Sequence, residues 1–161
     1  MVSARLPVFP WDTLADATAT ARAHPDGIVD LSVGTPVDPV APVIQEALTA
    51  AAAAPGYPAT AGTAALRASA VAALRRRHGI TGVPEQAVLP VIGTKEAIAG
   101  LTSILGIGAG ETVVIPEVAY PTYEVSALLA GATPVRADST VQLGPARPAL
   151  MFVHSPSNPT G

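Results

Sequence analysis

The sequence VLPVIGTKEAIAGLTSIL, residues 88–105, decides the fold that we expect for this chain. Residues 88–92 form a short apolar run, interrupted by Pro90, that is typical of a buried strand. After Gly93, which allows a tight turn, apolar residues recur with the period of a helix at Ala97, Ile98, Leu101, Ile104 and Leu105. The stretch therefore predicts a strand, a Gly93-Thr94-Lys95 turn and a helix.

The predicted turn is a candidate anion site. Free backbone N–H groups at a helix N-terminus attract an anion. Thr94 can cap the helix or offer its hydroxyl to a phosphate oxygen, and Lys95 adds a positive charge. The alternative is an ordinary turn with a threonine cap, because short turn motifs occur in many unrelated proteins. The turn by itself leaves both interpretations open.

Composition bounds the class of protein. With 161 residues, of which 49% are hydrophobic and 13% charged, the chain is long enough for one domain with a real core. A net charge of −3 gives no general attraction to nucleic acid or to anionic membranes. The absence of cysteine excludes disulfides, thiolate catalysis and cysteine metal sites, and we expect no metal centre. We see no signal peptide and no apolar run of membrane length, and therefore expect a cytoplasmic protein with no membrane partner.

Three consecutive arginines, residues 75–77, could suggest nucleic-acid binding. They lie in the last turn of a predicted helix, where cations are favoured by the helix dipole. No aromatic residues interleave them, as single-stranded nucleic acid binding would favour. We therefore expect no nucleic-acid partner.

The remaining chain alternates between helical and strand patterns. We expect helices at 11–24, from 43 to before Pro55, from 63 to before Gly79, and at 125–130, and strands at 28–33, 111–115, 132–135 and 149–154. This order predicts an α/β fold with a largely parallel sheet and right-handed crossovers. Ligands of such sheets lie beyond the carboxyl ends of the strands. We expect the turn at Gly93, the loop at Tyr120 and the loop at Asn158 to open on one edge, which favours the phosphate site.

The sequence stops at Gly161 on a strand-to-loop pattern, with no helix to cover the last strand. Parallel strands need both faces covered. We therefore expect this chain to be the N-terminal part of a longer protein.

An ordered series of five motifs resembles the fold type I, pyridoxal-phosphate-dependent aminotransferases of the aspartate aminotransferase class (class I/II). It runs from about residue 30 to 161 and consists of Leu31-Ser32-Val33-Gly34-Thr35-Pro36, Tyr57-Pro58-Ala59-Thr60-Ala61-Gly62 with Leu66-Arg67, Gly93-Thr94-Lys95-Glu96-Ala97, Tyr120-Pro121-Thr122-Tyr123 and Ser155-Pro156-Ser157-Asn158-Pro159-Thr160-Gly161. The opening, Phe9-Pro10-Trp11-Asp12 and the segment 24–34, is most similar to actinobacterial succinyldiaminopimelate transaminases.

The resemblance implies a division of the chain and a set of site residues. Residues 1–36 would be an N-terminal arm with part of the small domain, and 37–161 the first half of the large cofactor-binding domain. The implied cofactor is pyridoxal 5'-phosphate, with its phosphate on Gly93, Thr94 and Lys95, its ring against Tyr120 and its phenolate oxygen bonded by Asn158. In the implied homodimer, Tyr57 reaches the partner's cofactor phosphate, and the backbone of Gly34 approaches the substrate carboxylate.

Further expectations concern neighbouring residues. We expect Tyr123 to fill the core, and we assign no role to His154. The family suggests a cis peptide bond between Asn158 and Pro159, against about 5% for X–Pro bonds in general.

Lys95 is the only lysine of this sequence, but we do not expect it to form the Schiff base. It lies in the phosphate turn, too near the phosphate to reach the aldehyde carbon. In the family, the Schiff-base lysine, the aspartate at the pyridine nitrogen and the arginines that bind substrate carboxylates all follow the Asn-Pro motif. We therefore expect no catalytic residue within this chain.

The implied activity is transfer of an amino group between an amino acid and a keto acid. The substrate pair that we expect is N-succinyl-2-amino-6-ketopimelate with glutamate, in lysine and cell-wall precursor synthesis. The alternatives are another class I/II aminotransferase, a pyridoxal-phosphate-dependent lyase, a phosphate-ligand-binding α/β domain, or a truncated chain without catalysis.

Overall fold

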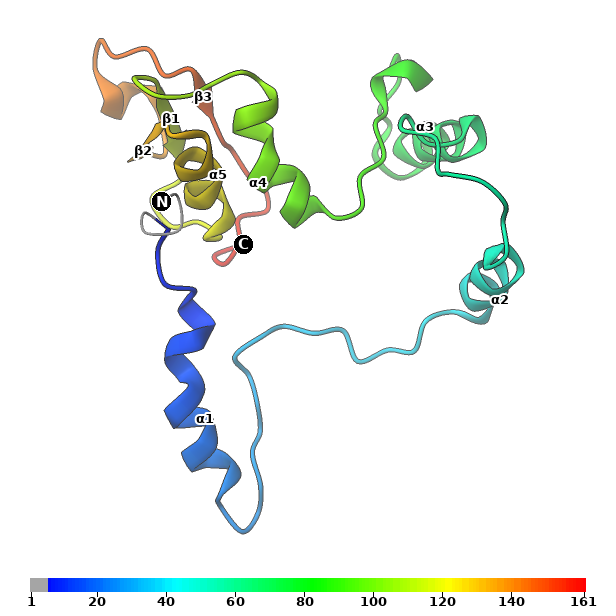
Figure 1. Ribbon diagram of the computed structural model, residues 1–161, viewed down its shortest axis with the longest axis horizontal. Helices are drawn as coiled ribbons and strands as arrows, with labels where there is room; N and C mark the ends of the chain where they lie inside the picture. The colour runs from blue at the N-terminus through cyan, green and yellow to red at the C-terminus, as the bar shows by residue number, and fades with distance from the viewer. Residues whose placement is uncertain (1–5) are drawn as a thin grey trace. The chain divides into compact units, whose positions relative to one another are not determined.

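The computed structural model describes residues 6–161 (Figure 1). The chain divides into two compact units, which are described separately. The first contains the N-terminal residues up to Ile28 together with Val91–Gly161, and the second is Val29–Pro90.

A three-stranded parallel sheet forms the centre of the first unit. The central strand β1 (Thr112–Ile115) lies between β2 (Thr133–Arg136) and β3 (Leu150–Met151). Thr112 pairs with Thr133 on one side and Val113 pairs with Leu150 on the other, both in parallel register. The predicted parallel α/β sheet is confirmed, although β3 is much shorter than the expected 149–154.

Helices α4 (Thr94–Ile104) and α5 (Thr122–Ala130) lie side by side over one face of this sheet (Figure 1). The core beneath them contains Val113, Ile115, Ala127, Ala132 and Phe152, with Ile98, Leu101 and Tyr123 packed against it. The predicted helical stripe of α4 is therefore confirmed at Ile98 and Leu101, and Tyr123 packs on the core as expected. The last residues of the stripe differ, because Ile104 is 78% exposed.

One polar pair lies inside the interface between α4 and α5. Thr102 and Ser126 are both fully buried, and their hydroxyl oxygens are 2.8 Å apart. One hydroxyl donates to the other, so each has a hydrogen-bond partner, which lowers the cost of burying them. The small side chains also let the two helices approach closely.

The N-terminal segment of the first unit is helical, as predicted for residues 11–24. It begins as a 3₁₀ helix (Pro10–Leu14) and continues as α1 (Ala15–Arg22). Proline at the first position suits a helix start, because its missing N–H would have no intrahelical partner there. A further 3₁₀ helix, Thr140–Leu143, follows β2.

The second unit contains α2 (Pro42–Ala51), α3 (Ala64–His78) and a 3₁₀ helix (Glu85–Ala87). The Thr63 hydroxyl caps α3 by accepting the Leu66 N–H at 3.1 Å. Gly79 ends the helix in the left-handed conformation, with φ of 65°. Both predicted helices and the predicted Gly79 cap are confirmed.

Two predicted strands are wrong. Segment 28–33 has no ladder partner among the described residues, and the Asp30 carboxylate instead accepts hydrogen bonds from the Ser32 N–H and hydroxyl. Such local bonds compete with a strand. Segment 88–92 is also irregular, with Ile92 fully exposed, and Pro90 offers no N–H for a ladder. Apolar content alone therefore misidentified both segments.

The described residues include no helix that is both long enough and apolar enough to cross a bilayer. They also contain no group of three or more His, Asp or Glu side chains that could hold a metal ion.

Candidate functional site

The first element of the candidate site is the N-terminus of α4. Thr94 begins the helix, and the N-cap Gly93 is extended, with φ of −170°. The amides of the first turn have no intrahelical partner, and Gly93 has no side chain to cap them. Backbone donors, the Thr94 hydroxyl and the Lys95 ammonium are thus gathered at the positive end of the helix dipole. Helix N-termini with free amides are a common place for phosphate binding in proteins.

The Glu96 carboxylate lies over the start of α4. A Cβ at Gly93 would meet the Oε2 atom of Glu96, the end of a flexible side chain that can move aside. The backbone of Gly93 is extended, a conformation that any residue adopts. Neither observation requires glycine at this position. An anion bound at this helix start would take the place of the Glu96 carboxylate.

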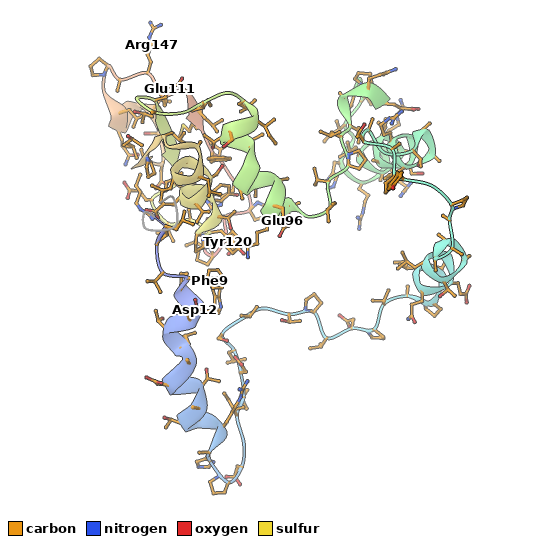
Figure 2. The ribbon with its side chains drawn as sticks, viewed as in Figure 1. Phe9, Asp12, Glu96, Glu111, Tyr120 and Arg147 are labelled. Atoms are coloured by element: carbon orange, nitrogen blue, oxygen red, sulfur yellow. The ribbon has the colours of Figure 1, made fainter. Side chains whose placement is uncertain are left out.

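Two aromatic residues of the N-terminal segment connect Lys95 with Tyr120. The Lys95 Nζ atom lies 5.2 Å from the centroid of the Phe9 ring, which stacks at 5.0 Å on Trp11. Trp11 in turn lies 6.4 Å from the Tyr120 ring. Figure 2 shows Tyr120 and Glu96 on the side of the sheet and its helices from which the N-terminal helix extends, with Phe9 at the start of that helix. Two of the predicted cofactor residues thus contact one aromatic pair.

The loop that carries Tyr120 is held by residues at the end of β2. The Arg136 guanidinium donates to the Glu117 carbonyl at 2.9 Å and to the Glu124 carboxylate at 2.8 Å. The Asp138 carboxylate accepts the Glu117 N–H at 3.0 Å. Glu117, at the start of the loop, is thus bonded to Arg136 and Asp138, and Glu124 in α5, after the loop, is bonded to the same Arg136. These bonds restrain the backbone that carries Tyr120.

Asn158 lies in a turn beyond β3 that side chains tie together. His154 contacts Ser157 through Nε2 at 3.2 Å, and Nδ1 accepts the Asn158 N–H at 3.5 Å. The Thr160 hydroxyl donates to the Ser157 hydroxyl at 2.8 Å. The Asn158–Pro159 peptide bond is cis, as predicted, and the Ser155–Pro156 bond is also cis. Since β1 and β3 are parallel neighbours, Tyr120 and Asn158 both follow the carboxyl edge of the sheet.

A cavity of about 450 Å³ opens beside this edge. Its lining includes Pro116 and Val118 after β1, Asp138 after β2, and His154 and Ser157 after β3. Thr94, Lys95, Tyr120 and Asn158 are not among its lining residues. The cavity therefore adjoins the Asn158 turn without coinciding with the predicted phosphate and ring contacts.

The other two predicted site residues, Gly34 and Tyr57, belong to the second unit. A Cβ at Gly34 would have no neighbour within 4 Å, so nothing in this unit demands glycine there. Tyr57 is 102% exposed, which leaves its whole ring and hydroxyl accessible. Arg67 donates at 2.8 Å to the carbonyls of Ala61 and Gly62 and so fixes the end of the Tyr57 loop.

The sequence reasoning missed several residues that shape the site. The sequence indicates Phe9 and Trp11 only as part of a similar opening and of the predicted helix at 11–24, and it indicates no role for His154. Arg136 and Asp138 carried no signal at all. Phe9, Trp11, Arg136 and Asp138 contact residues far away in the sequence, which no local motif encodes. The contacts of His154 with Ser157 and Asn158 are local, and its contact with Tyr123 is distant.

Comparison with models of protein families identifies the class of protein to which this chain belongs. The model of the aminotransferase class I and II family matches residues 26–161. The chain belongs to the class I and II aminotransferases. Membership of this family implies pyridoxal phosphate as cofactor. The residues fit it, since a helix N-terminus without a side-chain cap hydrogen bond, a cation in its first turn and the Tyr120 ring in the same unit suit a phosphorylated planar ligand.

Individual relatives support the same family. The chain is 72% identical over 160 residues to the "Probable aminotransferase Rv1178" of Mycobacterium tuberculosis, covering 99% of this chain and 38% of that protein. It is 53% identical to 4-dedimethylamino-4-oxo-anhydrotetracycline transaminase OxyQ of Streptomyces rimosus, covering 97% of this chain and 43% of that protein. The chain thus spans about two fifths of the length of these relatives.

Solved structures share the fold. The substrate-bound BacF structure from Bacillus subtilis matches with a TM-score of 0.85 at 26% identity, covering 99% of this chain and 44% of that one. N-Succinyldiaminopimelate aminotransferase from Mycobacterium tuberculosis matches with a TM-score of 0.68 at 29% identity, covering 81% of this chain and 38% of that one. The sheet and helices are the N-terminal portion of the type I pyridoxal-phosphate aminotransferase fold.

Proposed function

We propose that the full-length protein is a pyridoxal-phosphate-dependent aminotransferase whose cofactor site includes the N-terminus of α4. The observation that carries the proposal is the Phe9–Trp11 pair, which contacts Lys95 at that N-terminus and Tyr120 after β1. Phosphate donors and an aromatic platform thus contact the same aromatic pair, and both lie within residues 26–161, which match the family.

Each predicted residue has a physical task in this proposal. The amides of Thr94 and Lys95 bind the cofactor phosphate, and the Lys95 ammonium balances its charge. Tyr120 holds the pyridine ring by stacking, which contributes about 1 kcal/mol beyond burial. The Asn158 amide donates to the phenolate oxygen. When bound, the cofactor supplies the electron sink that amino-group transfer needs.

The second unit contributes two further residues. Tyr57, fully exposed on its loop, is proposed to reach the cofactor phosphate of the partner in a homodimer. The backbone of Gly34 is proposed to approach the substrate carboxylate. The division of the chain into residues 1–36 and 37–161 stays a prediction, as do these two roles.

For the substrates, we propose N-succinyl-2-amino-6-ketopimelate with glutamate. Support comes from the fold and 29% identity shared with a solved N-succinyldiaminopimelate aminotransferase. LL-diaminopimelate aminotransferase of Gloeobacter violaceus is 34% identical over 98% of this chain. Both names refer to diaminopimelate chemistry, the class of substrate that we propose.

A second candidate rests on the higher identity to OxyQ. At 53%, that transaminase, named for an oxo-anhydrotetracycline, is more similar to this chain than the solved N-succinyldiaminopimelate aminotransferase is. A bulky cyclic ketone is therefore the rival amino acceptor.

The test begins with the purified full-length protein. Addition of pyridoxal phosphate should produce the visible absorbance of lysine-bound cofactor, and borohydride should abolish that absorbance and leave a covalent pyridoxyl group. Peptide mapping should find the group on a lysine other than Lys95. No visible band at saturating cofactor would contradict the proposal.

Turnover then separates the substrates. Conversion of glutamate to 2-oxoglutarate should depend on the succinylated ketopimelate, with aspartate, branched-chain keto acids and a polycyclic ketone as comparisons. Preference for the polycyclic ketone would support the second candidate. Release of ammonia without an acceptor would instead indicate a lyase.

A further inference from the structure

We infer that His154 is a positioning residue for Asn158, acting on the cofactor through that asparagine. The inference rests on the proposed function, because it matters only where Asn158 bonds the cofactor. It concerns a histidine that follows β3 and that the five sequence motifs do not include.

The two ring nitrogens of His154 contact two consecutive residues of the turn. Nδ1 accepts the Asn158 N–H at 3.5 Å, and Nε2 lies 3.2 Å from the Ser157 hydroxyl oxygen. An acceptor at Nδ1 carries no proton, so the neutral ring has its proton on Nε2 and donates it to Ser157. One imidazole ring therefore holds the backbone N–H of Asn158 and the side-chain hydroxyl of Ser157.

The Ser157 hydroxyl extends this network to the end of the turn. It receives the Thr160 hydroxyl at 2.8 Å, while the Ser157 carbonyl accepts the Gly161 N–H at 2.8 Å. The turn is thus closed on itself around residues 157–161. Asn158 takes part through its backbone N–H, which leaves its side-chain amide available to donate to the cofactor.

The other side of the imidazole is packed against the core. The Tyr123 ring meets it edge-on, with centroids 5.7 Å apart and planes at 88°. Tyr123 also lies 5.0 Å from Phe152, which belongs to the buried cluster beneath α4 and α5. His154 therefore contacts both the packed core, through Tyr123, and the turn at residues 157–161, and it restrains the position of that turn.

The inference makes different claims for the two ring nitrogens. In His154→Asn, the Oδ1 atom can replace Nδ1 as the acceptor for the Asn158 N–H. In His154→Gln, the longer side chain can replace Nε2 toward Ser157 but offers no acceptor at the Nδ1 position. If the Asn158 contact is what matters, the asparagine variant should retain cofactor binding and the glutamine variant should not.

The experiment uses the full-length apoprotein, titrated with pyridoxal phosphate to obtain a dissociation constant. His154→Ala and His154→Gln should each raise this constant about tenfold, the effect of one lost hydrogen bond, while His154→Asn stays within about threefold of the wild type. Thermal melting of each apo variant reports the structural cost separately.

A double mutant decides whether His154 acts through Asn158. Asn158→Ala keeps the backbone N–H that His154 accepts but lacks the amide that reaches the cofactor. In that background, His154→Ala should leave the dissociation constant unchanged while lowering the melting temperature as it does in the wild type. A full additional loss of affinity would overturn the inference, and so would a His154→Ala variant that binds as tightly as the wild type.

The experiments distinguish a failure of the His154 inference from a failure of the proposed function. If Asn158→Ala weakens cofactor binding but no His154 variant does, the inference is wrong and the proposed function stands. If Asn158→Ala has no effect on binding, the proposed role of Asn158 is itself wrong. Should His154→Ala not fold, the asparagine and glutamine variants alone still distinguish the outcomes.

Discussion

The Lys95 ammonium lies 5.2 Å from the centroid of the Phe9 ring, at the first turn of α4. A cation is unfavourable at this end of a helix, because the helix dipole is positive there. The aromatic face compensates in part, by roughly 0.5–1 kcal/mol at an exposed site. A bound dianion would compensate for both the lysine and the dipole, which is why we interpret this turn as a phosphate site.

Replacing Lys95 should therefore weaken cofactor binding without unfolding the protein. In Lys95→Ala we expect the dissociation constant of pyridoxal phosphate to rise by about tenfold or more, the effect of one charge-assisted hydrogen bond. Lys95→Arg keeps the charge and should lose less. Titration of the full-length apoprotein measures both, and the visible absorbance at saturating cofactor should persist in each variant. Loss of that absorbance in Lys95→Ala would instead make Lys95 the Schiff-base lysine.

Trp11 should report cofactor binding through its fluorescence. It is the only tryptophan of this sequence, and its ring lies 6.4 Å from that of Tyr120. A cofactor on Tyr120 would absorb energy emitted by Trp11. The emission of Trp11 is obtained by subtracting the spectrum of Trp11→Phe from that of the wild type. This emission should decrease when pyridoxal phosphate is added and recover when the cofactor is removed. Quenching that is equally strong in Trp11→Phe would argue against a cofactor beside Tyr120.

In the proposed homodimer, Tyr57 of one subunit reaches the cofactor phosphate of the other. Tyr57→Phe removes only a hydroxyl from a fully exposed ring, so the melting temperature of the apoprotein should not change. The dissociation constant of pyridoxal phosphate should rise about fivefold to tenfold for a lost hydrogen bond.

Mixed dimers can establish whether the hydroxyl comes from the partner. A dimer of one Tyr57→Phe chain and one Lys95→Ala chain would contain one intact site and one site with both changes. We therefore expect cofactor titration of the mixture to regain a tight-binding fraction that neither homodimer has. If Tyr57 acted within its own chain, every site of the mixed dimer would remain weakened.

The buried pair Thr102 and Ser126 should stabilise the contact between α4 and α5. Ser126→Ala leaves the Thr102 hydroxyl buried without its 2.8 Å partner, at a cost of about 1–3 kcal/mol. The double variant Thr102→Val with Ser126→Ala removes both polar groups, and its free energy of unfolding should lie closer to the wild type. Chemical denaturation of the four proteins gives the coupling energy, and purely additive losses would contradict the interpretation.

The helices follow from local information. Ile98 and Leu101 face the core because their spacing places them on one side of α4. Thr63 and Gly79 terminate α3 because one accepts an N–H from the first turn and the other adopts a left-handed backbone. These features need no distant contact, and the sequence predicts them within a few residues.

The strands, unlike the helices, do not follow from local information. Segments 28–33 and 88–92 have apolar patterns as convincing as that of 111–115, yet only the last forms a strand. A strand exists only where a second backbone supplies ladder partners, and β1 has them on both sides. Hydrophobic pattern indicates that a segment can be buried, but not whether another strand lies beside it.

The sequence by itself determined the family and placed the helices within a few residues, because order and spacing along the chain carry that information. It also predicts Thr94, Lys95, Tyr120 and Asn158 as cofactor residues. Only the tertiary structure decided what surrounds them. Phe9 and Trp11 connect Lys95 to Tyr120, and His154 connects the Asn158 turn to Tyr123 and the core. These contacts join segments that are distant in the chain, and folding alone brings them together.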